Sequence, residues 1–164
     1  MKQWLMILAL WGMFAPLAAQ QPVTDIDLWA FSASTALAPG NNVDEFKAQQ
    51  GFIREEVQSL HADLDAQDAE PYPRLVTLHY QGGLRVRVVD YGEQAFLSQV
   101  KLNGPGRELH GGIKIGDTRK DALEKMGQPS RGGNSYSVFE GEKDVVRFMY
   151  QNGRLTSVEI DRGS

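Results

Sequence analysis

The N-terminus carries the longest apolar run of the chain. Lys2 precedes an apolar stretch over residues 4–14, and the small residues Ala18 and Ala19 follow it. A positive charge, an apolar stretch and a small-residue cleavage site are the three parts of a secretory signal peptide. An apolar stretch of this length is shorter than the about 20 residues that a membrane-spanning helix needs. The pattern therefore predicts a signal peptide over residues 1–19, cleaved after Ala19, and export of the rest of the chain.

After residue 39 the apolar positions first follow a helical period. Asn42 and Glu45 have the spacing of a capping box, which predicts a helix from residue 43 to about residue 50. A second helix is predicted from residue 52 to about residue 65, because apolar side chains recur there at helical intervals and share one face (Ile53, Val57, Leu60 and Leu64). The preceding residues 20–39 are weakly patterned and permit one short strand over residues 26–30.

From residue 75 the apolar period changes to alternation, which is typical of half-buried strands. Two strands are predicted over residues 75–89, joined by a glycine-bearing connection at residues 81–83. A third strand is predicted over residues 96–102, with Phe96 on the same side as Val100.

The second half of the chain repeats this order of elements. Asp117 or Thr118 caps a predicted helix over residues 119–126, which Gly127 terminates. An Asn-Gly pair at residues 152–153 is a strong hairpin signal. Three strands are predicted after the helix (residues 136–139, 145–150 and 154–160).

The two halves indicate an internal repeat, because the segments 96–102 and 154–160 superpose without gaps and each ends a predicted meander. The predicted fold class is α+β: two units, each a helix plus an antiparallel meander, form one sheet with the helices packed on one face. The predicted organisation is a signal peptide at 1–19, an N-terminal segment at 20–39, a first unit at 40–106 and a second unit at 107–164.

Composition narrows the classes of function. The chain has 17 Lys plus Arg against 21 Asp plus Glu, a net charge of −4, which disfavours nucleic-acid binding because such domains usually carry a basic stripe. Cysteine is absent, which excludes disulfides, thiolate metal sites and cysteine nucleophiles. No second apolar run follows the first, so we expect no membrane span after cleavage.

The residue types that carry catalysis or bind metals form no recognisable motif. The histidines His61, His79 and His110 fall in separate elements and lack the spacing of a zinc site. No serine lies in a G-x-S-x-G motif. The acidic run at residues 65–70 lacks the D-x-D-x-D-G spacing of a calcium loop. The sequence therefore predicts no metal, no cofactor and no enzymatic activity.

Residues 113–129, with residues 146–148 and 152–158, resemble the SmpA/OmlA family: a glycine before a capped helix, a Gly-x-Pro stop and then a meander. That family includes an outer-membrane lipoprotein of the barrel-assembly machinery. The tandem arrangement resembles the beta-lactamase inhibitory protein type, which is built from two helix-plus-sheet units. Without a cysteine, this chain would be a non-lipidated member. The resemblance implies a fold and leaves the function open.

A sheet with helices on one face leaves its other face free to bind. Alternation predicts the side chains that the first meander presents there (Thr77, His79, Arg85, Arg87, Gln99 and Lys101). For the second meander it predicts Val145, Arg147, Met149, Leu155 and Ser157, or the opposite set if the parity is reversed. A further candidate set is the strand-end tyrosines (Tyr80, Tyr91, Tyr136 and Tyr150). Arginine, methionine and aromatic residues are enriched at protein interfaces. A solvent-exposed strand face that keeps the protein soluble would carry the same polar residues, and buried tyrosines with hydrogen-bonded hydroxyls would show the same pattern.

These observations favour an exported, non-enzymatic protein-binding module, periplasmic or secreted. It would engage an envelope or exported protein through the free sheet face, as an accessory in envelope assembly. Two alternatives remain open. One is an inhibitor or immunity protein against an exported enzyme or toxin. The other is a small-ligand binder or a hydrolase whose site follows no visible motif.

Overall fold

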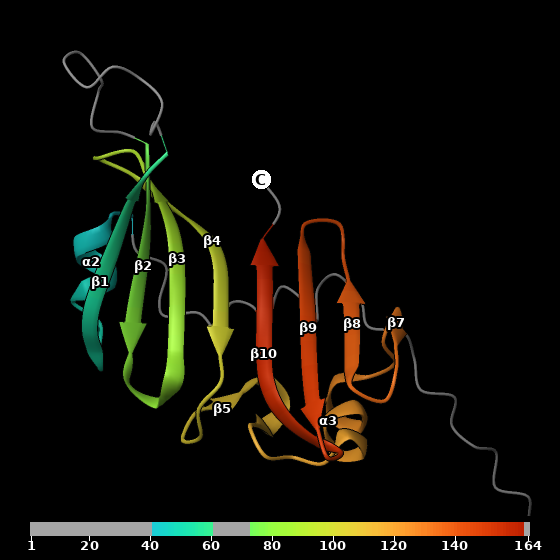
Figure 1. The fold of residues 1–164 in the computed structure, drawn as a ribbon. Coiled ribbons are helices and arrows are strands. Elements are labelled where there is room, and N and C mark those ends of the chain that lie inside the picture. Colours follow the sequence, from blue (N-terminus) through green and yellow to red (C-terminus); the bar gives the residue numbers. More distant parts are fainter. Residues whose placement is uncertain (1–40, 61–72, 163–164) are drawn as a thin grey trace, which may run out of the picture.

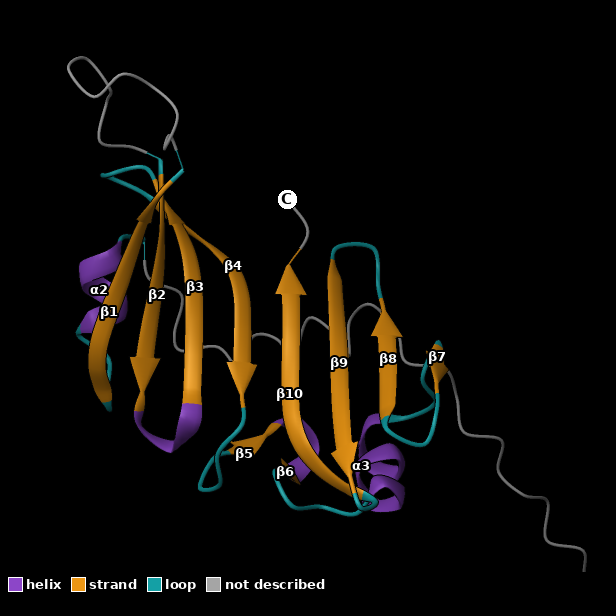
Figure 2. Cartoon of the chain, viewed as in Figure 1, coloured by secondary structure: helices purple, strands orange, loops and turns teal. Residues whose placement is uncertain are grey.

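The computed structural model describes residues 41–60 and 73–162 of the 164-residue chain. The predicted signal peptide, the N-terminal segment 20–39, His61 and the acidic run at 65–70 lie outside these residues. Within them, one antiparallel sheet of eight strands dominates the fold and the helices are few (Figures 1 and 2). None of the helices in this part of the chain has the length and apolar character that crossing a membrane requires.

The first half of the described chain is a short helix followed by four strands. These elements are α2 (Val43–Lys47), β1 (Phe52–Ser59), β2 (Arg74–Tyr80), β3 (Leu84–Asp90) and β4 (Ala95–Leu102). The predicted cap of α2 is confirmed, because the Asn42 side chain accepts a hydrogen bond from the Glu45 N–H at 3.0 Å. The predicted β2–β3 connection is also confirmed, as a tight 3-10 turn over Gln81–Gly83.

The second half contains a small hairpin, a helix and four strands. These are β5 (Glu108–Leu109), β6 (Ile113–Lys114), α3 (Arg119–Met126), β7 (Arg131–Gly132), β8 (Tyr136–Glu140), β9 (Asp144–Gln151) and β10 (Arg154–Arg162). Thr118 caps α3 by accepting from the Asp121 N–H at 3.1 Å. Gly127 ends the helix at a φ of 107°, a conformation that favours glycine, so both predicted boundaries are confirmed.

The strand order is β1-β2-β3-β4-β10-β9-β8-β7, and every neighbouring pair is antiparallel. The last strand of the chain, β10, therefore pairs with β4 in the middle of the sheet. Their register places Val100 opposite Ile160 and Leu102 opposite Val158. Strands β1 and β7 lie at the two edges of this sheet, as Figure 1 shows.

The hydrophobic core lies on one face of this sheet. Val43 and Phe46 of α2, Ile113 of β6 and Ala122 of α3 join one buried cluster with the inward side chains of strands β2–β4 and β8–β10. The Tyr80 hydroxyl donates to the Phe46 carbonyl at 2.7 Å and holds α2 against the sheet. Burial raises the pKa of that hydroxyl to about 12. We call this the covered face and the opposite one the open face.

The predicted second helix is wrong, because residues 52–59 form the edge strand β1. Nearly all its side chains are exposed, Ile53 at 59% and Val57 at 52%, so no alternating apolar face is encoded. The helical spacing of the apolar residues in this segment therefore does not reflect a helix. Backbone pairing with β2 along Glu55 to Ser59 decides the conformation instead, a tertiary contact that local pattern does not report.

Two predicted side-chain orientations are wrong for a common reason. The register of β3 with β4 shifts between Arg87 and Val88, so Phe96 faces away from Val100 and is 56% exposed. The register of β10 with β9 shifts beside Leu155, which is buried at 1% exposure instead of lying on the free face. An inserted residue in one strand reverses the alternation beyond it.

Two ion pairs on the covered face lie at one end of the sheet, and each joins residues that are opposite one another on neighbouring strands. Asp90, 1% exposed, accepts from Arg74 Nε at 2.7 Å, and Asp144, 6% exposed, accepts from Arg162 Nε at 3.2 Å. The Gly92 N–H donates to the second Asp90 oxygen at 2.9 Å. A buried carboxylate is tolerated when it is paired and hydrogen-bonded in this way.

Replacing Asp90 by alanine should therefore lower the free energy of unfolding by about 2 kcal/mol, because a charge-assisted bond and a turn contact are lost together. Urea denaturation followed by circular dichroism measures the change. Glu93→Ala removes an exposed carboxylate from the same turn and should change stability by less than about 0.5 kcal/mol. Equal midpoints for the two variants would contradict the role given to Asp90.

Candidate functional site

In the described part of the chain, no helix or hairpin covers the open face. Strand register arranges its side chains in rungs that cross the strands. One rung carries Thr77, Arg87, Gln99 and Asp161. The next carries His79, Arg85, Lys101, Glu159 and Arg147. The open face is therefore a polar and mostly charged surface at its centre.

The structure places most of the predicted strand-face residues on the open face. Thr77, His79, Arg85, Arg87, Gln99 and Lys101 form two adjacent rungs over β2, β3 and β4. Arg147 and Met149 lie on β9, and strand β10 separates them from the first group. Val145 shares their face, opposite Asp161, whereas Leu155 does not.

The sequence analysis missed two carboxylates of β10 that lie between these groups. Lys101 Nζ is 3.4 Å from Glu159, and Arg147 forms an ion pair with Asp161. Gln99 Nε2 donates to both carboxylates, at 2.9 and 2.7 Å. The sequence contains a signal for this placement, because Glu159 and Asp161 alternate with the buried Val158 and Ile160 and therefore lie on the open face. They neutralise two of the predicted basic side chains.

Arg85 and Arg87 of β3 remain without a carboxylate partner among the described residues. Arg85 is half-buried between His79 and Lys101, and Arg87 is exposed. The nearest acid beyond His79 is Glu56, which already lies 2.5 Å from Arg54 and 3.2 Å from the His79 imidazole. Basic side chains that lie next to one another on neighbouring strands repel each other and destabilise a sheet. Arg85 and Arg87 therefore do not stabilise the fold through charge pairing.

An exposed aromatic pair lies at one end of the same face. The rings of Tyr91 and Phe96 meet edge to face with centroids 5.7 Å apart, and both are more than half exposed. Phe96 is opposite Val89 in the rung beside Arg87. These side chains line a groove of about 570 Å³ that Arg162 borders. The groove opens where β4 and β10 part, because their pairing ends at Gln99 and Asp161.

The strand-end tyrosines do not form one binding set. Tyr80 and Tyr150 are buried on the covered face, at 2% and 6% exposure, and burial raises the pKa of both hydroxyls. Tyr91 and Tyr136 are exposed, at 53% and 40%. The interpretation as buried tyrosines therefore holds for two of the four.

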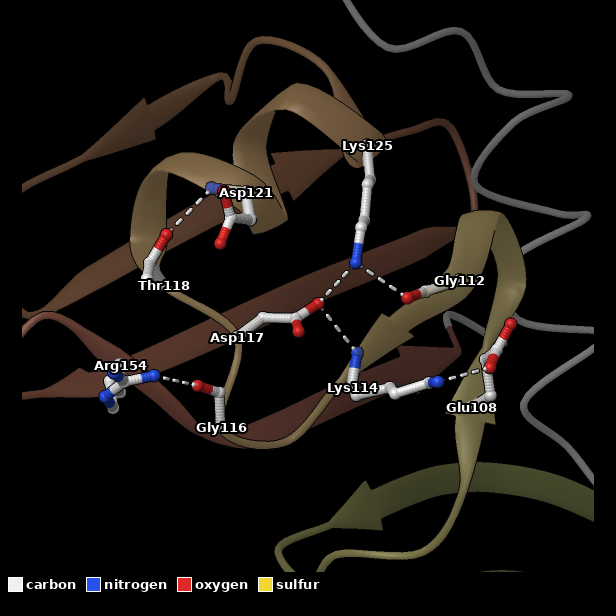
Figure 3. A network of polar contacts seen from close by, with 9 residues as sticks. All are labelled: Glu108, Gly112, Lys114, Gly116, Asp117, Thr118, Asp121, Lys125 and Arg154. Atoms are coloured by element: carbon white, nitrogen blue, oxygen red, sulfur yellow. Dashed lines mark hydrogen bonds and ion pairs between the residues drawn. The ribbon is translucent and has the colours of Figure 1, made fainter.

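A denser polar network surrounds α3, away from the open face (Figure 3). Lys125 Nζ donates to the Gly112 carbonyl and to Asp117 Oδ2, both at 2.8 Å, and the Lys114 N–H donates to the same Asp117 oxygen at 3.0 Å. Glu108 lies 2.8 Å from Lys114 Nζ. Desolvation raises the pKa of Asp117, but the two lysines outweigh it and the pKa lies below its usual value. The network ties the helix to the β5–β6 hairpin.

In residues 41–60 and 73–162, no three His, Asp or Glu side chains lie close enough together to hold a metal ion. A polar cleft of about 680 Å³ lies between loops at the end of the sheet, beside Gln49, Gln81 and Arg107. It holds no nucleophile with a neighbouring base. Comparisons of the chain with protein-family models, curated proteins and solved structures find no match. The open face, with its unpaired arginines and groove, is the candidate site.

Because the Asp117 carboxylate accepts hydrogen bonds from the Lys125 ammonium and the Lys114 N–H in the folded state, its lowered pKa stabilises the protein at neutral pH. Asp117→Asn should cost about 1 kcal/mol there. That difference is fully present above the usual pKa of 3.8 and disappears as the pH falls through the folded-state value. Thermal melts between neutral pH and pH 3 measure it. Glu124→Gln, at an exposed helix position, is the control, and a difference independent of pH would contradict the assignment.

Proposed function

We propose that the protein is an exported, non-enzymatic module that binds a partner protein on the open face. The observation that carries this proposal is the pair Arg85 and Arg87, which have no carboxylate partner among the described residues and lie at the centre of a sheet face that no described helix or hairpin covers. Arginine binds carboxylates through a rigid planar fork and is enriched at interfaces. Exposed Phe96, Met149 and Tyr136 add the apolar contacts that interfaces use.

We further propose that the chain consists of two related units. A detail of the last strand in each half supports the repeat. Ser98 is the inserted residue of β4, and its hydroxyl donates to the Arg87 carbonyl at 3.2 Å. Thr156 is the inserted residue of β10, and its hydroxyl donates to the Met149 carbonyl at 3.1 Å. Ser98 and Thr156 occupy the same position when segments 96–102 and 154–160 are superposed. Two unrelated meanders have no reason to carry a bulge at the same position.

This pattern, with capped helices ahead of meanders, supports the proposed place near the SmpA/OmlA family as a non-lipidated tandem member. The role that follows is an accessory of envelope assembly, periplasmic or secreted. Inhibition of an exported enzyme or toxin is the second candidate, and the same open face would serve it. A stoichiometric loss of one enzyme's activity distinguishes the inhibitor from the accessory.

The proposal predicts that Arg85→Glu with Arg87→Glu weakens partner binding by at least about tenfold while the fold persists, because both side chains project from the sheet without internal partners. The tagged chain from residue 20 onward is used to capture proteins from the envelope of the native host. Mass spectrometry identifies the retained protein, and titration calorimetry gives its affinity for each variant.

A matched control is Lys120→Glu with Lys143→Glu, which changes the net charge equally but lies off the open face. It should leave the affinity within about twofold, since exposed charges far from an interface contribute little. Circular dichroism checks that each variant folds. Unchanged binding by the folded Arg85 and Arg87 double variant would refute docking on the open face.

A further inference from the structure

We infer that the open face selects an extended acidic segment with one large apolar anchor: the anchor enters the groove beside Phe96, and two carboxylates bind Arg87 and Arg85. This inference rests on the proposed function and specifies the chemistry of the partner. It joins two features that lie on consecutive rungs, the groove and the unpaired cations.

The groove has room for a large apolar side chain. Its volume of about 570 Å³ is bounded by Val89, Tyr91 and Phe96, and the aromatic rings already lie edge to face, so a third ring can stack against them. Phe96 is 56% exposed and Tyr91 is 53% exposed. Covering such side chains removes apolar surface from water, which makes this groove the natural anchor position of an interface.

The spacing along β3 sets the distance between anchor and charges. Val89, Arg87 and Arg85 point to the same face at successive alternate positions. Alternate residues of a strand are about 6.7 Å apart. An extended segment of the partner has the same spacing, so an anchor at position i places the side chains of i+2 and i+4 opposite Arg87 and Arg85.

The charges around this track favour carboxylates and limit their number. Lys101 is paired with Glu159 and His79 contacts Glu56, so the positive field along this track comes from Arg85 and Arg87 themselves. Beyond β4, Glu159 and Asp161 of β10 face the same surface and repel further negative charge. The surface therefore fits a short acidic segment along β3 better than an extended polyanion across the sheet.

Synthetic peptides with blocked ends test the track directly. The matching peptide is Ser-Trp-Ser-Glu-Ser-Glu-Ser. Three controls change one feature each: Ser-Trp-Glu-Ser-Glu-Ser-Ser shifts the acids by one position, Ser-Ala-Ser-Glu-Ser-Glu-Ser removes the anchor, and Ser-Trp-Ser-Lys-Ser-Lys-Ser reverses the charge. Titration into the isotope-labelled chain from residue 20 onward, followed by amide chemical shifts in nuclear magnetic resonance spectra, gives both site and affinity.

The matching peptide should shift the amides of Arg85, Arg87, Val89 and Phe96, and each control should bind at least about fivefold more weakly. Phe96→Ser should weaken the matching peptide by a similar factor but leave the anchor-free peptide unchanged. Val57→Ser, an exposed apolar position on the edge strand β1, is the matched control and should change neither. Higher salt should weaken the acidic peptides.

Equal binding of all four peptides, or shifts outside β3 and β4, would overturn the inference. So would a second copy of the chain as the occupant, seen as dimerisation in sedimentation experiments that Phe96→Ser abolishes. A different result refutes the proposed function: the Arg85→Glu and Arg87→Glu double variant still binds the captured partner at full affinity. Peptide selectivity and partner capture therefore report on the two proposals independently.

Discussion

The pairing of β4 with β10 is the interaction on which the rest of the architecture depends. Four residue pairs, from Leu102 with Val158 to Gln99 with Asp161, join the two meanders into one sheet. Without them, each meander would expose an edge strand and half of a divided core. The same pairing makes Val100, Leu102, Val158 and Ile160 part of one buried cluster. A continuous sheet with a continuous core follows from this short seam.

The seam also decides the electrostatics of the open face. It brings Glu159 and Asp161 of β10 against Lys101 and Gln99 of β4. Lys101 and Arg147 are thereby paired with acids of β10, whereas Arg85 and Arg87 of β3 keep no carboxylate partner among the described residues. A locally basic strand in a chain of net charge −4 is thus a product of topology. The position of Arg85 and Arg87 one strand away from the seam leaves them available to a partner.

Local signals explain which elements the sequence could predict. The caps of α3 and the hairpin at residues 81–83 depend on residues close in the chain, and both were predicted correctly. The edge strand β1 has no buried face to encode, and its conformation depends on β2, so the sequence suggested a helix. The candidate face was predicted because alternation in β2 and β3 is uninterrupted. Its pairing with β10 was not, because register across the seam is a long-range property.

The bulge at Ser98 explains why the predicted orientation of Phe96 is wrong, and the same bulge shapes the proposed site. Strict alternation puts Phe96 on the side of Val100, in the core. The inserted Ser98, held by its hydroxyl on the Arg87 carbonyl, turns Phe96 to the open face instead and leaves Leu97 to face the core. The exposure of an aromatic ring beside the unpaired arginines therefore depends on one extra residue. A bulge disrupts the ladder locally, but here the Ser98 hydroxyl donates to the Arg87 carbonyl and the displaced Phe96 side chain forms a wall of the groove.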